Sequence, residues 1–134
     1  MSVTTATTLA VTAAAPTTEA TRVALANDIK TILNLHFADR SAHGSAVSAQ
    51  IATADATNEA SAITLANACK AAYNTGGHIN ASNVHANNDA TNTISASAAT
   101  DQASLDTLLA ELKTDINAHI IAALAGNHLE FVDA

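Results

Sequence analysis

Six histidines are the residues in this sequence best suited to chemistry, and they fall into three pairs: His36 and His43, His78 and His85, His119 and His128. Imidazoles from several helices can bind one transition metal ion, so a site built from His36, His78 and His119 is one hypothesis. However, all six lie at or just after a predicted helix C-terminus, where histidine caps free carbonyl groups and suits the helix dipole. No HExxH or cysteine-rich pattern accompanies them, so we expect capping and no bound metal.

Other reactive side chains form no catalytic set. Cys69 could act as a nucleophile only beside a base, and its position on a predicted apolar face favours burial instead. Asp28, Glu111 and Asp115 are too scattered to nominate an acid–base pair. Gly76-Gly77 belongs to no phosphate-binding motif. We therefore expect no catalytic residue, no cofactor and no enzyme.

The charge distribution argues against nucleic acid and membrane partners. The net charge is −7, and the five lysines and arginines are dispersed rather than clustered. No stretch approaches the roughly 18 apolar residues of a membrane helix. The N-terminal stretch has no positive charge and no continuous apolar block, so it does not resemble a signal peptide. We expect a soluble chain made in a cytoplasm.

The helices that must position these side chains belong to a sequence repeat that occurs three times in the chain. Residues 11–34, 51–74 and 94–117 align without gaps, which indicates duplicated supersecondary units. Each unit opens with a β-branched residue and a short segment of small residues. A threonine then stands where we expect the helix N-cap, at Thr17, Thr57 and Thr100. An acidic or amide side chain follows in the first turn, at Glu19, Glu59 and Gln102.

Apolar residues at intervals of four then mark one face of a helix in each unit. This helix-packing stripe consists of Leu25, Ile29, Leu33, Leu65, Cys69, Tyr73, Leu108, Leu112 and Ile116. The pattern predicts helices over about 17–37, 57–75 and 100–125. The expected fold is mostly all-α: three repeated amphipathic helices with an extended N-terminal arm and extended linkers.

The connections and ends are harder to assign. We divide the chain into an arm at 1–16 and a helical domain at 17–134, with repeats at about 11–50, 51–93 and 94–134. VSAQIAT (47–53) and TNTIS (91–95) alternate like short edge β-strands. The arm and the C-terminal HLEFVDA are either disordered or ordered against a neighbouring subunit.

Lysine and asparagine recur in every copy, four residues apart beside the stripe, which suggests a common role. They are Lys30, Lys70 and Lys113 with Asn34, Asn74 and Asn117. They could form a polar seam between helices or subunits, with asparagine fixing register. Alternatively, they are surface inherited through duplication.

The core material is thin. Alanine supplies 34 of the 134 residues, whereas Leu, Ile, Val and Phe together supply 28. Because alanine buries little area, we expect contacts with other subunits, including further copies of this chain, to complete the core.

The sequence resembles small Ala/Thr-rich, internally repeated virion structural proteins of tailed bacteriophages. The resemblance lies in the stretches LANACKAAYN and ATDQASLDTLLAELKTDINAHI and in the terminal VDA. The likeness covers about 56–134 directly and 17–55 through the repeat; Cys69 and Gly76-Gly77 depart from it. The resemblance implies a virion component, either a capsid decoration protein or a head–tail (neck or tail) subunit that contacts other virion proteins. It supplies no functional residues. The alternative is a helical ligand- or metal-binding module that uses the histidines.

Overall fold

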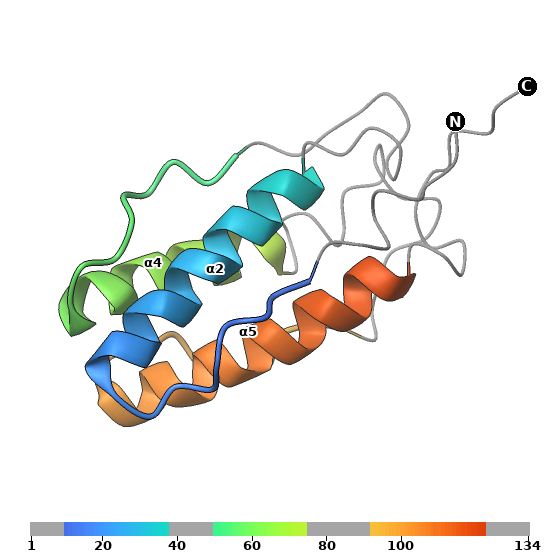
Figure 1. The fold of residues 1–134 in the computed structure, drawn as a ribbon. Helices are drawn as coiled ribbons and strands as arrows, with labels where there is room; N and C mark the ends of the chain where they lie inside the picture. The colour runs from blue at the N-terminus through green and yellow to red at the C-terminus, as the bar shows by residue number, and fades with distance from the viewer. Residues whose placement is uncertain (1–9, 38–49, 75–91, 123–134) are drawn as a thin grey trace, which may run out of the picture.

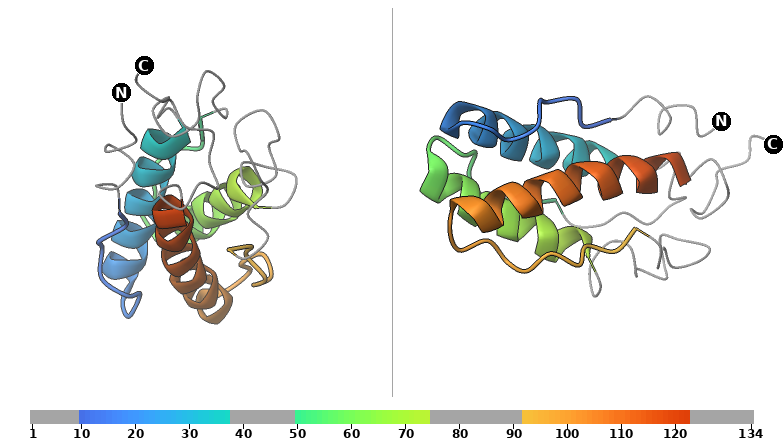
Figure 2. Two further views of the ribbon diagram at one scale, coloured as in Figure 1. Left: turned by 90° about the vertical axis from the view of Figure 1, so that its right-hand side faces the viewer. Right: turned by 90° about the horizontal axis from the view of Figure 1, so that it is seen from below.

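The computed structural model describes residues 10–37, 50–74 and 92–122, and within them the chain is all-α, as the periodicity predicts. Helix α2 spans Glu19–Phe37, α4 spans Glu59–Tyr73 and α5 spans Gln102–Ala122. The three helices pack against one another with their N-terminal ends at the same end of the molecule (Figures 1 and 2). Because all three run in the same direction, the chain must return along the outside before each new helix.

Residues 50–58 and 92–101 are the described parts of these two returns, and a third extended segment, residues 10–18, leads into α2 (Figure 1). Each precedes its own helix and runs back along a different one. Residues 50–58 lie on α2, residues 92–101 lie on α4, and residues 10–18 lie on α5. The described parts of the two expected edge strands, 50–53 and 92–95, are extended but pair with no strand among the described residues. They bind helix side chains instead.

The N-caps lie one residue later than the sequence pattern predicts. α4 begins after Asn58, whose Oδ1 accepts a hydrogen bond from the Ser61 backbone N–H at 2.9 Å. Ser61 Oγ in turn accepts from the Asn58 N–H at 3.0 Å, which completes a reciprocal capping box. Equivalent pairs start the other helices: Thr18 with Thr21, and Asp101 with Ser104.

The predicted caps have a different role. The backbone N–H groups of Thr17, Thr57 and Thr100 donate to the same third-position hydroxyls, each at 2.8 Å. The prediction was wrong because two adjacent residues in each unit can accept hydrogen bonds, and the third-position hydroxyl selects the second of them. Each hydroxyl oxygen thereby accepts hydrogen bonds from two consecutive backbone N–H groups just before the helix. These bonds fix the angle at which the segment enters the helix.

The helix-packing stripe forms the core of the bundle. All nine of its residues are fully buried, and Ala26, Ala62 and Ala66 are buried with them. Since alanine adds little bulk, these positions let the helices approach closely. The β-branched residue that opens each unit covers the core from outside: Val11, Ile51 and Ile94.

A single chain therefore buries its own stripe, and the expectation that other subunits must complete the core was wrong for the described residues. Leu35 is the one large hydrophobic side chain exposed in this part of the molecule, at 51 %. The extended segments cover part of the helical core, a contribution to burial that cannot be seen from amino-acid composition. Their opening residues, Val11, Ile51 and Ile94, are buried against the core cluster of the helices, where they exclude water.

The expected arm and helix ends differ from the structure in two places. Residues 10–16 lie on helices of the same chain, rather than on a neighbouring subunit as one interpretation of the arm proposed. α4 ends at Tyr73, two residues before its predicted end, with Asn74 as its C-cap. Residues 1–9 and the tail HLEFVDA lie outside the described residues.

Candidate functional site

The most distinctive polar feature is a set of three equivalent contacts between a helix asparagine and the backbone of an extended segment. Asn34 Oδ1 accepts from the Ile51 N–H at 2.7 Å, and Asn34 Nδ2 donates to the Ile51 carbonyl at 3.1 Å. Asn74 binds Ile94 in the same two-point manner, at 2.8 Å for both bonds. Asn117 binds Val11 at 2.7 and 3.0 Å. We call Asn34, Asn74 and Asn117 the asparagine clamps.

A lysine one turn before each clamp holds the same segment two residues further on. Lys30 Nζ donates to the Thr53 carbonyl at 2.6 Å, and Lys70 Nζ donates to the Ala96 carbonyl at 2.6 Å. Lys113 Nζ donates to the Ala13 carbonyl at 2.7 Å. Lys30 also pairs with Asp55, although Asp55 is 73 % exposed and such pairs contribute little.

The clamps close a ring. α2 holds the second segment, α4 holds the third, and α5 holds the first. The three units are therefore related by an approximate threefold axis parallel to the bundle. The recurring Lys and Asn are neither a helix–helix seam nor passive surface, because they fasten backbone that would otherwise lie unpaired against the helices.

A further asparagine contact exists in two units and is absent from the third. Asn27 binds both backbone groups of Ala56, and Asn67 binds both of Ala99, at 2.7–3.0 Å. The equivalent residues on α5 and in the first segment are Ala110 and Pro16. Proline has no N–H to donate, so an asparagine at position 110 would lack half of its contact. Pro16 and Ala110 thus replace both partners of the contact that Asn27 makes with Ala56 and Asn67 makes with Ala99.

In the first and third units, one carboxylate holds the extended segment to the helix that follows it. Asp28 Oδ2 accepts from the Thr12 and Ala13 N–H groups, both at 3.0 Å. The equivalent Glu111 accepts from Ser95 N and Oγ at 2.6 and 3.0 Å, and from Ala96 N at 2.9 Å. Burial alone would raise the pKa of Glu111. The hydrogen bonds from Ser95 and Ala96, with the positive charge of Lys70, outweigh burial and place the pKa below its ordinary value.

We expect Glu111→Gln to weaken the pH dependence of stability on the acid side. A carboxylate whose pKa is lower in the folded state stabilises the fold fully above the unfolded pKa of about 4.3, and this stabilisation is lost as the pH falls through the folded pKa. The loss at neutral pH should be small, on the order of 0.5 kcal/mol, because solvent reaches the group. Urea unfolding between about pH 3 and 7 measures it.

A complementary variant controls this measurement. The second unit has Ala68 where the others carry a carboxylate. Ala68→Glu should steepen the acid limb, because it supplies an acceptor for the backbone of residues 52 and 53. If Glu111→Gln leaves the limb unchanged, the carboxylate does not hold its segment as described.

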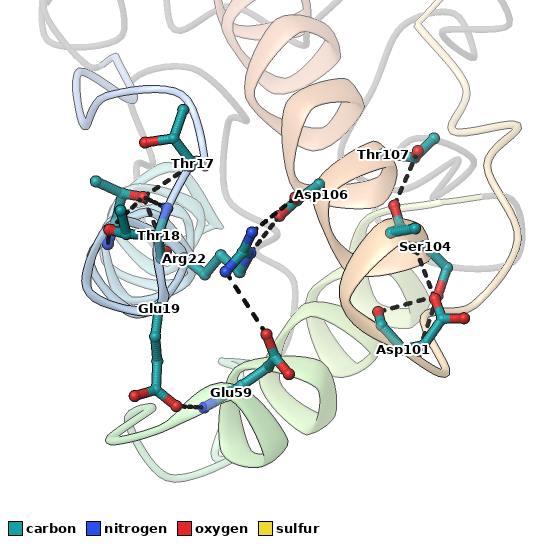
Figure 3. Close-up of polar contacts among 11 residues, drawn as sticks. Thr17, Thr18, Glu19, Arg22, Glu59, Asp101, Ser104, Asp106 and Thr107 are labelled. Atoms are coloured by element: carbon teal, nitrogen blue, oxygen red, sulfur yellow. Dashed lines mark hydrogen bonds and ion pairs between the residues drawn. The ribbon is translucent and has the colours of Figure 1, made fainter.

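At the N-terminal end of the bundle, Arg22 joins side chains from all three units (Figure 3). Its guanidinium donates to Asp106 at 2.6 and 3.0 Å and lies 3.6 Å from Glu59. In the amide orientation that satisfies both groups, Gln102 also accepts from it. The hydrogen bond to Asp106 raises the Arg22 pKa against the opposing effect of burial, and nearby carboxylates add to the increase. The other two units have Ala62 and Leu105 at the equivalent positions, both buried, so the charge of Arg22 breaks the threefold symmetry.

Near the opposite end, two of the three candidate metal ligands come together. His36 and His119 are fully buried, and their rings meet edge to face with centroids 5.1 Å apart. Tyr73 packs on His119 at 5.6 Å and donates its hydroxyl proton to the Asn92 carbonyl at 2.7 Å. His78 lies outside the described residues. Within residues 10–37, 50–74 and 92–122, no group of three or more His, Cys, Asp or Glu is placed to hold a metal.

Cys69 occupies a core position, as its place in the stripe predicts. Its side chain is fully buried, and desolvation raises the pKa of the thiol to about 12. Since the thiolate is the nucleophilic form, the thiol is unreactive at neutral pH.

The recurring polar side chains of the described residues therefore hold extended backbone segments against the helices. Sequence reasoning placed the clamp residues on one face but missed their partners, and it missed Asn27, Asn67 and Arg22 as functional positions. The signal for Asn27 and Asn67 was their recurrence in two units. No helix in the described part of the chain is both long and apolar enough to cross a membrane. Comparisons with protein-family models, curated proteins and solved structures find no match.

Proposed function

We propose that this chain is a non-enzymatic structural subunit of a tailed bacteriophage virion, either a capsid decoration protein or a head–tail component. It would act by docking on other virion proteins and on further copies of itself. It would be made in the host cytoplasm and reside in the particle. The proposal joins the sequence resemblance to the architecture described above.

The observation that best supports the proposal is that the recurring lysines and asparagines bind the chain's own backbone. All three lysines and all three clamp asparagines of the repeat bind backbone carbonyls or amides of the chain's own segments. A set of side chains used this way makes a fixed body with an approximate threefold axis. Such a body suits a repeated, symmetric assembly, in which each subunit must present the same shape.

The three extended segments begin at one end of the bundle. Gln50 donates to the Asn34 carbonyl, and the Asn92 carbonyl accepts from Tyr73, so both returns begin beside the C-terminal ends of the helices. Ala10 precedes the residue held by Asn117 and lies at the same end. At the other end, the capping boxes join segment to helix directly.

The proposal is tested by mass spectrometry of purified particles of the phage whose genome encodes this chain. The expected result is a copy number of several or more chains per particle that persists through density-gradient purification. A chain found in the soluble lysate and absent from particles would refute a virion role. A well-characterised capsid protein in the same sample provides the copy-number reference.

The pairing of His36 with His119 favours a second candidate function, a metal-binding helical module. Dialysis against zinc or nickel, followed by elemental analysis, tests it. Binding near one metal per chain that is lost in His119→Phe would favour this function. A wild-type chain that retains no metal would eliminate it.

A further inference from the structure

The contacts that the three units share do not by themselves determine which units are neighbours. The asparagine clamps bind backbone N–H and carbonyl groups, and every extended segment offers such groups. The first stripe position is a fully buried leucine in every helix: Leu25, Leu65 and Leu108. If the helices stood in the opposite order around the bundle axis, each clamp would still hold an extended segment. Selecting one order in a bundle of equivalent units requires residues that differ between the units.

One pair of such residues joins the first and third units at the N-terminal end of the bundle (Figure 3). Arg22 of α2 and Asp106 of α5 are 84 residues apart and form two hydrogen bonds, at 2.6 and 3.0 Å. Arg22 is only 5 % exposed, so its charge is satisfied inside the bundle. At the other two interfaces the repeat places apolar pairs in these positions: Ala62 with Val23, and Leu105 with Ile63.

In the opposite order, Arg22 and Asp106 would lose each other. The flank of α5 that carries Asp106 would face α4, and Arg22 would lie against the flank of α4 that carries Ile63. A buried charge that loses its partner is strongly unfavourable, whereas a buried ion pair adds little net stability because both groups are desolvated. The pair of Arg22 with Asp106 therefore penalises the opposite order more than it stabilises the present one.

A second pair, Pro16 with Ala110, lies at the same interface. Asn27 and Asn67 each bind both backbone groups of one alanine in the segment on their helix, at 2.7–3.0 Å. Pro16 has no N–H to offer, and Ala110 has no side-chain amide. In the present order these two residues meet, so both asparagines have a complete partner. In the opposite order the first segment would lie on α4, and Asn67 would face Pro16.

We propose that these two pairs, Arg22 with Asp106 and Pro16 with Ala110, select the order of the units around the bundle axis. They make the third unit, and not the second, the one that holds the first segment. Both pairs depart from the repeat in matched fashion, and both fall at the one interface whose residues are far apart in the sequence. The inference goes beyond the proposed function, because it concerns the single chain and holds for any partner.

A full-length variant with four substitutions tests the proposal by making this interface like the other two. It combines Arg22→Leu/Asp106→Ile with Pro16→Ala/Ala110→Asn. The variant should remain helical, with a urea midpoint within about 0.5 M of the wild-type value or above it, because apolar residues replace a buried ion pair with little or no loss. Its ¹H–¹⁵N NMR spectrum should nevertheless show two sets of peaks, the minor set at least about one tenth of the total. The wild-type chain should show one set.

Nuclear Overhauser contacts of Val11 identify the two orders. In the present order the Val11 N–H donates to the side chain of Asn117 on α5. In the opposite order the first segment would lie on α4, so the minor set of peaks should show Val11 beside Asn74. A single set of peaks in the four-residue variant, with Val11 beside Asn117 alone, would overturn the proposal.

The matched control moves the charged pair to the interface between the first and second units. Its changes are Arg22→Ala, Ala62→Arg, Asp106→Val and Val23→Asp, with Pro16→Ala and Ala110→Asn as before. The composition of this layer of the bundle stays the same, and a charged pair again distinguishes one interface from the other two. The spectrum should therefore return to one set of peaks. Two sets of peaks in this control would show that a charged pair does not select the order.

A comparison of two simpler variants decides the matter if the four-residue variant does not fold. Asp106→Ile leaves Arg22 buried without its main partner, so the urea midpoint should fall by about 1 M or more. Arg22→Leu/Asp106→Ile should return the midpoint to within about 0.5 M of the wild-type value. A double variant as unstable as the single one would mean that the pair stabilises the fold rather than selecting the order, and would overturn the proposal.

Discussion

Leu112→Ala is expected to lower the free energy of unfolding by about 3 kcal/mol, within the range of roughly 2–5 kcal/mol for removing a leucine side chain from a packed core. Leu112 is fully buried, as are the equivalent residues Ile29 and Cys69. The loss combines the transfer of the removed atoms to water with the cavity they leave. Urea unfolding followed by far-ultraviolet circular dichroism gives the value.

Leu35→Ala is the control for this variant. It removes the same atoms from a helix position that is 51 % exposed, so the change should stay within about 0.5 kcal/mol. Similar losses for Leu35 and Leu112 would mean that the stripe does not form the core. A loss at Leu112 that grows with protein dilution would indicate that a partner copy completes the core after all.

Asn34→Ala is expected to cost about 2 kcal/mol. The substitution removes two hydrogen bonds and leaves the Ile51 N–H and carbonyl without their partner in a part-buried groove, at roughly 1–3 kcal/mol for a group left unsatisfied. The gain in helix propensity offsets roughly 0.5 kcal/mol of that. Thermal and urea unfolding of the variant measure the loss.

Thr31→Ala, one turn earlier on α2 and exposed, is the matched control and should change stability by less than about 0.5 kcal/mol. The Ile51 amide should also lose its protection from deuterium exchange in Asn34→Ala. If the variant is as stable as Thr31→Ala and Ile51 remains protected, the clamp contributes nothing to the fold.

Much of the helical architecture could be predicted because it depends on local chemistry. Stripe spacing of four places Leu25, Ile29 and Leu33 on one helical face whatever lies opposite. The repeat then transfers that assignment to the other two units, including Cys69 in the second. The N-caps were misplaced by one residue because adjacent side chains in each unit are both suitable acceptors, and only the geometry of the third-position hydroxyl distinguishes them.

The partners of the recurring lysines and asparagines could not be predicted in the same way. Their spacing places them on a shared face, but their partners are main-chain groups, which leave no mark in the sequence. One indirect signal existed. Pro16 stands in the first unit where the others have alanine, and Ala110 stands where the others have asparagine. The two substitutions, Pro16 and Ala110, are explained by the loss of a single contact only if the first segment lies on the third helix.

The expectation of a core too thin to stand alone failed for a related reason. Composition counts apolar side chains but does not show how closely helices approach or what covers their grooves. Ala26 and Ala66 allow close packing, and Val11, from a distant part of the sequence, is buried against the core. A count of large side chains underestimates burial when backbone segments provide the cover.

The central claim is that each helix holds the extended segment of the next unit and that α5 holds the first, which closes the ring. A double-mutant cycle with Pro16→Ala and Ala110→Asn tests it most directly, because the pair would restore the contact that Asn27 makes with Ala56. Each single change should cost about 0.5–1 kcal/mol, through lost backbone restriction or lost helix propensity. Together they should show a favourable coupling of about 1–2 kcal/mol in urea unfolding. Costs that simply add, with no coupling, would contradict the closed ring.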